Sequence, residues 1–84
     1  MIKVLFFARI REELDCPGIE IPFGEAVNDL DALQEQLFLE HGERWREILT
    51  QHNIIRAVNQ SVVEDDSPLK DGDEVAFFPP VTGG

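Results

Sequence analysis

The N-terminal stretch of the chain carries the alternation of side chains that is typical of a β-strand. Residues 2–8 are rich in β-branched and aromatic types, which predicts a strand that begins almost at the first residue. A period of two places one set of side chains toward the core, namely Val4, Phe6 and Ala8. The opposite face then mixes charge with apolar bulk, through Lys3, Leu5, Phe7 and Arg9.

A second short strand is predicted at residues 19–23, where apolar side chains return after the stretch 11–18. That stretch supplies residues that are common in turns, so the two strands can pair as a hairpin. Pro22 has no backbone N–H to donate, which indicates that the second strand lies at an edge of the sheet.

The middle of the chain changes to a helical period. Leucines recur at helical spacing, at Leu30, Leu33 and Leu37. A suitable N-cap precedes them at Asn28 or Asp29, and the pair His41-Gly42 predicts where the helix ends. Residues 43–50 predict a shorter helix that covers the core with Trp45, Ile48 and Leu49.

The last third of the chain returns to strands. Residues 54–58 predict one strand, residues 59–61 a turn, and Val62-Val63 a very short strand. Polar residues 65–72 precede a final strand at residues 74–78. This order fits an α+β fold in which a mixed sheet of about five strands is packed by one main helix and a short second helix. That is the β-grasp, or ubiquitin-like, arrangement, with the first and last strands side by side in the sheet centre.

Composition limits the chain to one small domain. Its 84 residues leave no room for a separate catalytic domain, and 43% hydrophobic residues are enough for a packed core. The longest apolar stretch is too short to span a bilayer, and Arg9 and Arg11 interrupt any signal-peptide pattern. We therefore expect a cytoplasmic protein with no membrane partner.

The net charge is −10, which repels nucleic-acid phosphates and anionic membranes, so we expect no nucleic-acid partner. The same charge either serves solubility or steers the domain toward basic partners, and the two interpretations do not exclude each other. A single cysteine, Cys16, excludes an intramolecular disulfide, and we interpret it as a bystander thiol. His41 and His52 lie eleven residues apart without a ligand pattern around them, so we predict no metal site.

The C-terminal tail is the most informative feature of the sequence. It reads Pro79-Pro80-Val81-Thr82-Gly83-Gly84 and follows directly on the last predicted strand. The two prolines end strand pairing and favour a stiff, extended path, and glycine lets a backbone pass through a narrow channel. Six residues can reach roughly 20 Å, far enough to enter another protein's active site. We therefore predict a β-grasp domain over residues 1–78 and an extended, flexible tail over residues 79–84, with the Gly84 carboxylate as the reacting group.

The ending from Asp71 to Gly84 resembles, over its whole length, the signature of the MoaD-type small subunits of molybdopterin synthase, which belong to the ubiquitin-like superfamily. Two further segments resemble the same family, residues 2–9 at the start and Ala57-Val58-Asn59-Gln60 before the final hairpin. Residues 12–53 resemble it only in pattern and spacing.

The resemblance implies a sulfur carrier that is not an enzyme on its own. An adenylyltransferase similar to the ubiquitin-activating type would use ATP to convert the Gly84 carboxylate into an acyl-adenylate, and a sulfur donor protein would turn it into a thiocarboxylate. The carrier, which binds no cofactor stably, would then insert its tail into the large subunit, in a heterotetramer of two small and two large subunits. There its sulfur would pass to cyclic pyranopterin monophosphate and build the dithiolene of molybdopterin.

Docking requires a surface as well as a tail. If the terminal strands are neighbours, Phe77 is expected inside and Phe78 outside, on the same face as Phe7. An exposed patch of Phe7, Phe78 and Val62 suits an interface centre with a rim of Arg9 and Arg11. The alternative is that a loop or helix of the same chain covers these rings. The resemblance favours the interface, because MoaD-type proteins bind their large subunit through this face.

Three other functions are compatible with the same features. A thiamin-pathway sulfur carrier shares the fold, the Gly-Gly end and the activation chemistry. A ubiquitin-like protein modifier would join Gly84 to a lysine of a target through an isopeptide bond. A plain β-grasp interaction module would have an inert end, and deletion of Gly84 would then leave its function intact.

Overall fold

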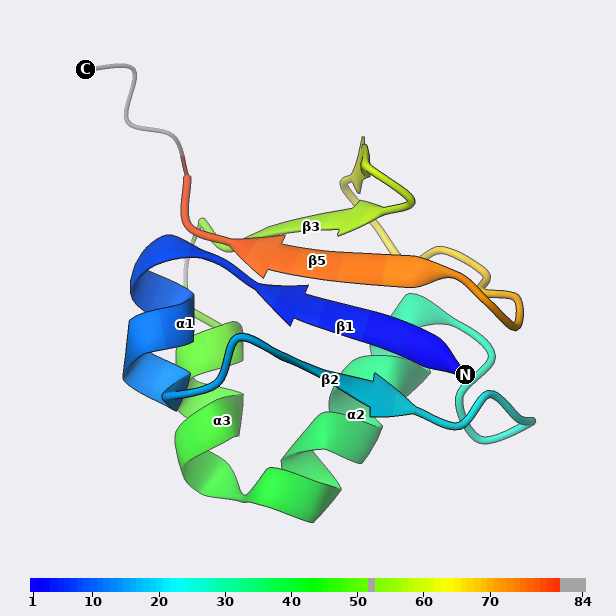
Figure 1. Ribbon diagram of the computed structural model, residues 1–84, viewed down its shortest axis with the longest axis horizontal. Coiled ribbons are helices and arrows are strands. Elements are labelled where there is room, and N and C mark those ends of the chain that lie inside the picture. The colour runs from blue at the N-terminus through cyan, green and yellow to red at the C-terminus, as the bar shows by residue number, and fades with distance from the viewer. Residues whose placement is uncertain (52, 81–84) are drawn as a thin grey trace.

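The computed structural model describes residues 1–51 and 53–80. Five strands form one sheet, in the order β2-β1-β5-β3-β4 (Figure 1). The strands are β1 (Ile2–Phe6), β2 (Gly18–Ile21), β3 (Ile55–Val58), β4 (Ser61–Val63) and β5 (Glu74–Phe78). The helices of the described residues are α1 (Ala8–Leu14), α2 (Leu30–His41) and α3 (Glu43–Leu49). The β-grasp class predicted from the order of elements is confirmed.

The first and last strands lie side by side in the sheet centre, as predicted, and the structure shows that they run parallel. Their register places Val4 opposite Val75 and Phe6 opposite Phe77. All four side chains are fully or almost fully buried. β2 pairs antiparallel with β1 at one edge of the sheet, as predicted. It spans Gly18–Ile21 and not residues 19–23, so Pro22 lies just beyond the strand.

Aromatic and leucine side chains fill the space between the sheet and the helices. The Phe6 ring stacks on Phe77 with 5.8 Å between centroids and meets Trp45 of α3 edge to face at 5.3 Å. From α2 come three completely buried residues, Leu30, Leu33 and Leu37. Burial of such side chains contributes about 1.5–3 kcal/mol each, so this layer provides most of the stability of the domain.

The ends of α2 follow the local signals in the sequence. The Asp29 side chain accepts a hydrogen bond from the Ala32 N–H at 2.8 Å, which makes it the N-cap. At the other end, Gly42 has φ of 93°, a value that other residues rarely adopt, and separates α2 from α3. Trp45, Ile48 and Leu49 of α3 are buried, as the sequence predicted.

The segment after β1 differs from the prediction. A helix, α1, occupies Ala8–Leu14, where the sequence had predicted the end of a strand and then a turn. The strand ends at Phe6, and Ala8 is exposed with φ of 53°, so the prediction that Ala8 faces the core is wrong. Ile10 and Leu14, four residues apart, are buried instead and pack the helix against the core. β1 and β2 are therefore antiparallel neighbours joined by a helix, and the described residues contain three helices where two were predicted.

The β3–β4 connection is the tight turn that the sequence predicted. Asn59 and Gln60 have φ of 49° and 70°, the left-handed geometry of a two-residue hairpin turn that matches the twist of the strands. None of the helices in the described part of the chain is long and apolar enough to cross a bilayer.

Candidate functional site

The C-terminal tail begins at the junction of β5 and α1. The Phe7 N–H donates a hydrogen bond to the Phe77 carbonyl at 3.1 Å, which fixes the start of α1 against the end of β5. Figure 1 shows β5 ending beside the first turn of α1. Pro79 and Pro80 follow and are half-buried. The predictions for Val81, Thr82, Gly83 and Gly84 fall on residues that lie outside the described part of the chain.

The face of the sheet turned away from the helices is largely apolar. Cross-strand pairs share a face, so the register that buries Val75 and Phe77 places the alternate residues of β5 on this second face. One row of paired positions crosses four strands, through Val62, Ala57, Ala76 and Leu5. We call this surface, together with Ile55, Phe78 and Phe7, the open face. Ala57 is 4% exposed yet is not part of the core cluster, because its neighbours on the open face cover it.

Phe7 and Phe78 lie together where the tail leaves the open face. Their rings meet edge to face, with centroids 6.4 Å apart and an interplanar angle of 78°. Phe7 is 44% exposed and Phe78 is half-buried, whereas Phe77 is completely buried. The prediction of Phe77 inside and Phe78 outside therefore agrees with the structure.

Val62 lies at the opposite side of the open face, on the edge strand β4, and is 63% exposed. It belongs to a groove of about 540 Å³ between β3, β4 and Pro80. Side chains that sequence reasoning had not assigned to the site also line this groove, namely Ile55, Arg56 and Glu64. The sequence could have placed Ile55 on the open face, because it is two residues from Ala57 in a strand and such residues lie on the same face.

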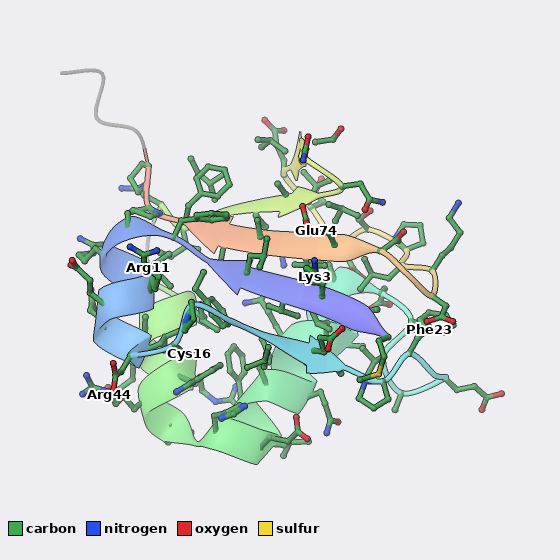
Figure 2. All side chains as sticks on the ribbon, in the orientation of Figure 1. Lys3, Arg11, Cys16, Phe23, Arg44 and Glu74 are labelled. Carbon is green, nitrogen blue, oxygen red and sulfur yellow. The ribbon has the colours of Figure 1, made fainter. Side chains whose placement is uncertain are left out.

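Two arginines of α1 lie on the side of the site next to the tail. Arg9 forms an ion pair with Glu13 at 3.0 Å and lies 3.5 Å from the Gln51 side-chain oxygen. Arg11 is exposed, and Figure 2 shows it on α1 at the end of the molecule where β5 ends. Both arginines were predicted as the rim of an interface, and the structure brings them close to the Phe7–Phe78 pair through the short helix.

At the other end of β5, Asn59 ties the hairpin turn to the start of the strand. Its side-chain NH₂ donates to an Asp73 carboxylate oxygen at 3.0 Å, and its side-chain oxygen accepts from the Glu74 N–H at 3.0 Å. The Asp73 carboxylate also accepts from the Lys70 N–H at 2.8 Å. The hydrogen bond from Asn59 is the largest cause that holds the pKa of Asp73 below its usual value, and the hydrogen bond from the Lys70 backbone is the next.

The remaining candidate groups lie away from this site. The Cys16 thiol is half-buried and donates to the Gly18 carbonyl at 3.5 Å. The His41 ring stacks on Trp45 with 3.8 Å between centroids, and His52 lies outside the described residues. Within residues 1–51 and 53–80, His, Cys, Asp and Glu side chains form no group of three or more that could hold a metal ion.

Comparison with known proteins agrees with this geometry. The model of the ThiS family matches residues 4–84. The chain belongs to the ThiS family. It is 45% identical to the molybdopterin synthase sulfur carrier subunit of Escherichia coli (strain K12), with all of both chains covered.

Two solved structures share the fold and about a third of the sequence. One is a putative molybdopterin converting factor subunit 1 from Pyrococcus furiosus, with a TM-score of 0.73 and 30% identity over 95% of this chain and 97% of that one. The other comes from a protein–protein complex of subunits 1 and 2 of the molybdopterin-converting factor of Helicobacter pylori 26695. It has a TM-score of 0.66 and 31% identity, over 99% of this chain and 97% of that one.

Proposed function

We propose that this protein is the sulfur carrier subunit of a molybdopterin synthase. The observation that carries the proposal is the place from which the tail starts. The open face leads through the Phe7–Phe78 pair to Pro79 and Pro80, and the sequence then continues to Gly-Gly. The 45% sequence identity to the Escherichia coli sulfur carrier subunit, over the full length of both chains, supports it.

The reacting group is the Gly84 carboxylate. A terminal carboxylate has a pKa of about 3.5 and is anionic at neutral pH, which makes it resistant to nucleophiles. An adenylyltransferase first joins it to the phosphate of AMP, with release of pyrophosphate from ATP. Sulfide from a donor protein then attacks the acyl carbon and AMP leaves, which produces a thiocarboxylate. Its soft, anionic sulfur is suited to attack the electrophilic carbons of cyclic pyranopterin monophosphate once water is excluded.

The open face forms the docking surface for the large subunit. Phe7, Phe78 and Val62 supply exposed apolar area, and Arg9 and Arg11 supply a polar rim. Pro79 and Pro80 direct the tail into the active site of that subunit, and glycines at the end pass where side chains would not fit. Two loaded carriers are used for each dithiolene, which agrees with a heterotetramer of two small and two large subunits.

The deciding experiment is intact-mass analysis of the protein purified from cells that make molybdenum cofactor. We expect a fraction of molecules in which one sulfur replaces one oxygen at Gly84, and none in a variant that lacks Gly83 and Gly84. Loaded protein with the large subunit should convert cyclic pyranopterin monophosphate to molybdopterin.

Other outcomes identify the alternative functions. Delivery of sulfur to a thiazole precursor, with none to the pterin, indicates a thiamin-pathway carrier. Adducts on other proteins that survive reductant and mild base indicate a protein modifier. Retained function after loss of Gly84 indicates an interaction module with an inert end. Each of these results, in the absence of sulfur transfer from Gly84 to the pterin, overturns the proposal.

A further inference from the structure

The amino groups of this chain are segregated from its tail. The sequence contains two lysines, Lys3 and Lys70, and a third amine at the N-terminus of Met1. The other five basic side chains are arginines. Lysine and N-terminal amines are nucleophiles when neutral, whereas the arginine guanidinium stays protonated and is not. The positions of the two residue types therefore decide where the chain can attack an acyl group.

All three amines belong to the end of the sheet where β5 begins. The Met1 ammonium pairs with Asp71, and the Met1 carbonyl accepts from the Gly72 N–H at 3.0 Å. The Lys3 N–H donates to the Asp73 carbonyl at 3.0 Å, and Lys70 closes the turn before β5 through its hydrogen bonds with Asp73. Figure 2 shows Lys3 beside Glu74, the first residue of β5.

The tail leaves from the other end of β5, where the nearby cations are arginines. Phe78 is four residues beyond Glu74, a separation of about 13 Å along a strand. Arg9 and Arg11 lie on α1, and a backbone hydrogen bond joins the start of this helix to the end of β5. Arg56 is opposite Phe77 and lines the groove that contains Pro80. Its guanidinium is held by Asp31 at 3.0 Å.

We propose that arginine, in place of lysine, at positions 9, 11 and 56 is a selectivity determinant that prevents the activated C-terminus from acylating its own chain. The inference rests on the proposed function, because only an activated Gly84 needs such protection. In the prevented reaction, a neutral lysine amine attacks the Gly84 acyl carbon, the bond to AMP breaks, and the amine proton passes to solvent. The product is a cyclic amide that can no longer accept sulfur.

The protection works by position and by effective concentration. The six-residue tail can reach roughly 20 Å, so the far amines are not excluded by length alone. To meet them, the tail must fold back along β5 against the extended bias of its two prolines, which lowers their effective concentration at the acyl carbon. Cys16 also carries a group that can attack an acyl carbon. Its thiol is half-buried and packs against the core, beyond the end of α1 that is far from the tail.

The test begins with a chemically activated chain that needs no partner enzyme. The full-length protein is prepared as its Gly84 α-thioester by intein cleavage, and intramolecular attack by an amine then releases the thiol and forms an amide. The double variant Arg9→Lys/Arg11→Lys is compared with the wild type by intact mass, and tandem mass spectrometry locates the amide. We expect the variant to cyclise at least about tenfold faster, because an amine close to the tail root has a high effective concentration.

The control is Arg44→Lys, which keeps the charge and adds one amine where the double variant adds two. The Arg44 guanidinium donates to the Glu13 carbonyl near the far end of α1, about 7.5 Å along the helix from Ala8. We expect its cyclisation rate to stay within about twofold of the wild type, since its amine is distant from the tail. The rate in the double variant should rise about tenfold per pH unit below the lysine pKa. Equal rates in the double variant and in either the wild type or Arg44→Lys overturn the inference.

A second arm separates this inference from the proposed function. The unmodified wild type and the double variant are incubated with ATP and a purified adenylyltransferase of the ubiquitin-activating type from the same organism, without a sulfur donor. ATP-dependent pyrophosphate release from the wild type supports the proposed function. If the thioester arm shows the expected difference but no pyrophosphate is released, the proposed function fails and the segregation is not a protective device. If pyrophosphate is released but the thioester rates are equal, the inference alone fails.

Discussion

The rings of Phe7 and Phe78 meet edge to face across the parallel pair β1 and β5, with 6.4 Å between their centroids. Phe7 is the last residue before α1, and Phe78 is the last residue of β5 before the prolines. The contact therefore joins the open face to the base of the tail. A partner that covers these rings would therefore lie next to the base of the tail.

Changing Phe78 to Ala is expected to weaken binding to the large subunit by about 2 kcal/mol or more, which is the cost of removing an aromatic interface anchor. Isothermal titration calorimetry with the purified large subunit measures this loss. Leu39→Ala is the matched control, because Leu39 is 77% exposed on α2, away from the open face. A loss of thermal stability with unchanged binding would assign Phe78 to the core.

Changing the neighbouring residue, Phe77→Ala, should have the opposite profile. Phe77 is completely buried against Phe6, and removal of such a ring costs about 3–5 kcal/mol. That is a large part of the stability of a small domain, so chemical denaturation should show a shift of the midpoint or a protein that is unfolded without denaturant. A stable Phe77→Ala variant with weak partner binding would show that the faces of β5 had been assigned the wrong way round.

Removing Gly83 and Gly84, or adding residues after Gly84, is expected to abolish sulfur transfer without loss of stability. The core of the described residues is formed between Ile2 and Phe77, so we expect it to remain intact when the last two residues are removed. Molybdopterin formation measures the first effect and thermal denaturation the second. Full activity of an extended protein that is not processed would contradict the mechanism.

The Asn59–Asp73 hydrogen bond predicts how stability depends on pH. A carboxyl whose pKa is lower in the folded than in the unfolded state stabilises the fold above its unfolded pKa, and this contribution is lost as the pH falls through the folded pKa. Asp73 is such a group, with a usual value of 3.8. The free energy of unfolding should therefore decline below about pH 4, in part through Asp73.

The variant Asn59→Ala should reduce this decline, because it removes the largest cause of the lowered pKa. It also loses two hydrogen bonds and places alanine at φ of 49°, so we expect it to be about 1–3 kcal/mol less stable at neutral pH. Urea denaturation at pH 7 and pH 3 measures both effects. An equal difference between variant and wild type at the two pH values would exclude Asp73 as the titrating group.

Local patterns in the sequence were sufficient for most of the fold. The Leu30, Leu33 and Leu37 spacing, the Asp29 cap and Gly42 determine α2, because each acts within one or two helical turns. Pro22 indicated an edge strand for a similarly local reason, since a missing N–H donor is tolerated there. The Gly-Gly end needed no structure at all, because a terminal carboxylate on a proline-led tail is a property of the chain itself.

Local patterns failed where two periods overlap. Residues 4–8 form one uninterrupted apolar run, and nothing in it marks Phe6 as the last strand residue, so the period of two was extended into α1. Ile10 and Leu14 carried the helical signal, but only their burial against the core decides between a turn and a helix.

The sequence by itself determined the residues of the tail and the class of fold, since these depend on residue type and on neighbours along the chain. Only the tertiary structure decided that Phe7 meets Phe78, that Asn59 binds Asp73, and that the amines lie at the end of β5 away from the tail. Each of these relationships joins residues far apart in sequence, and the strand register that brings them together is set by packing of the whole core.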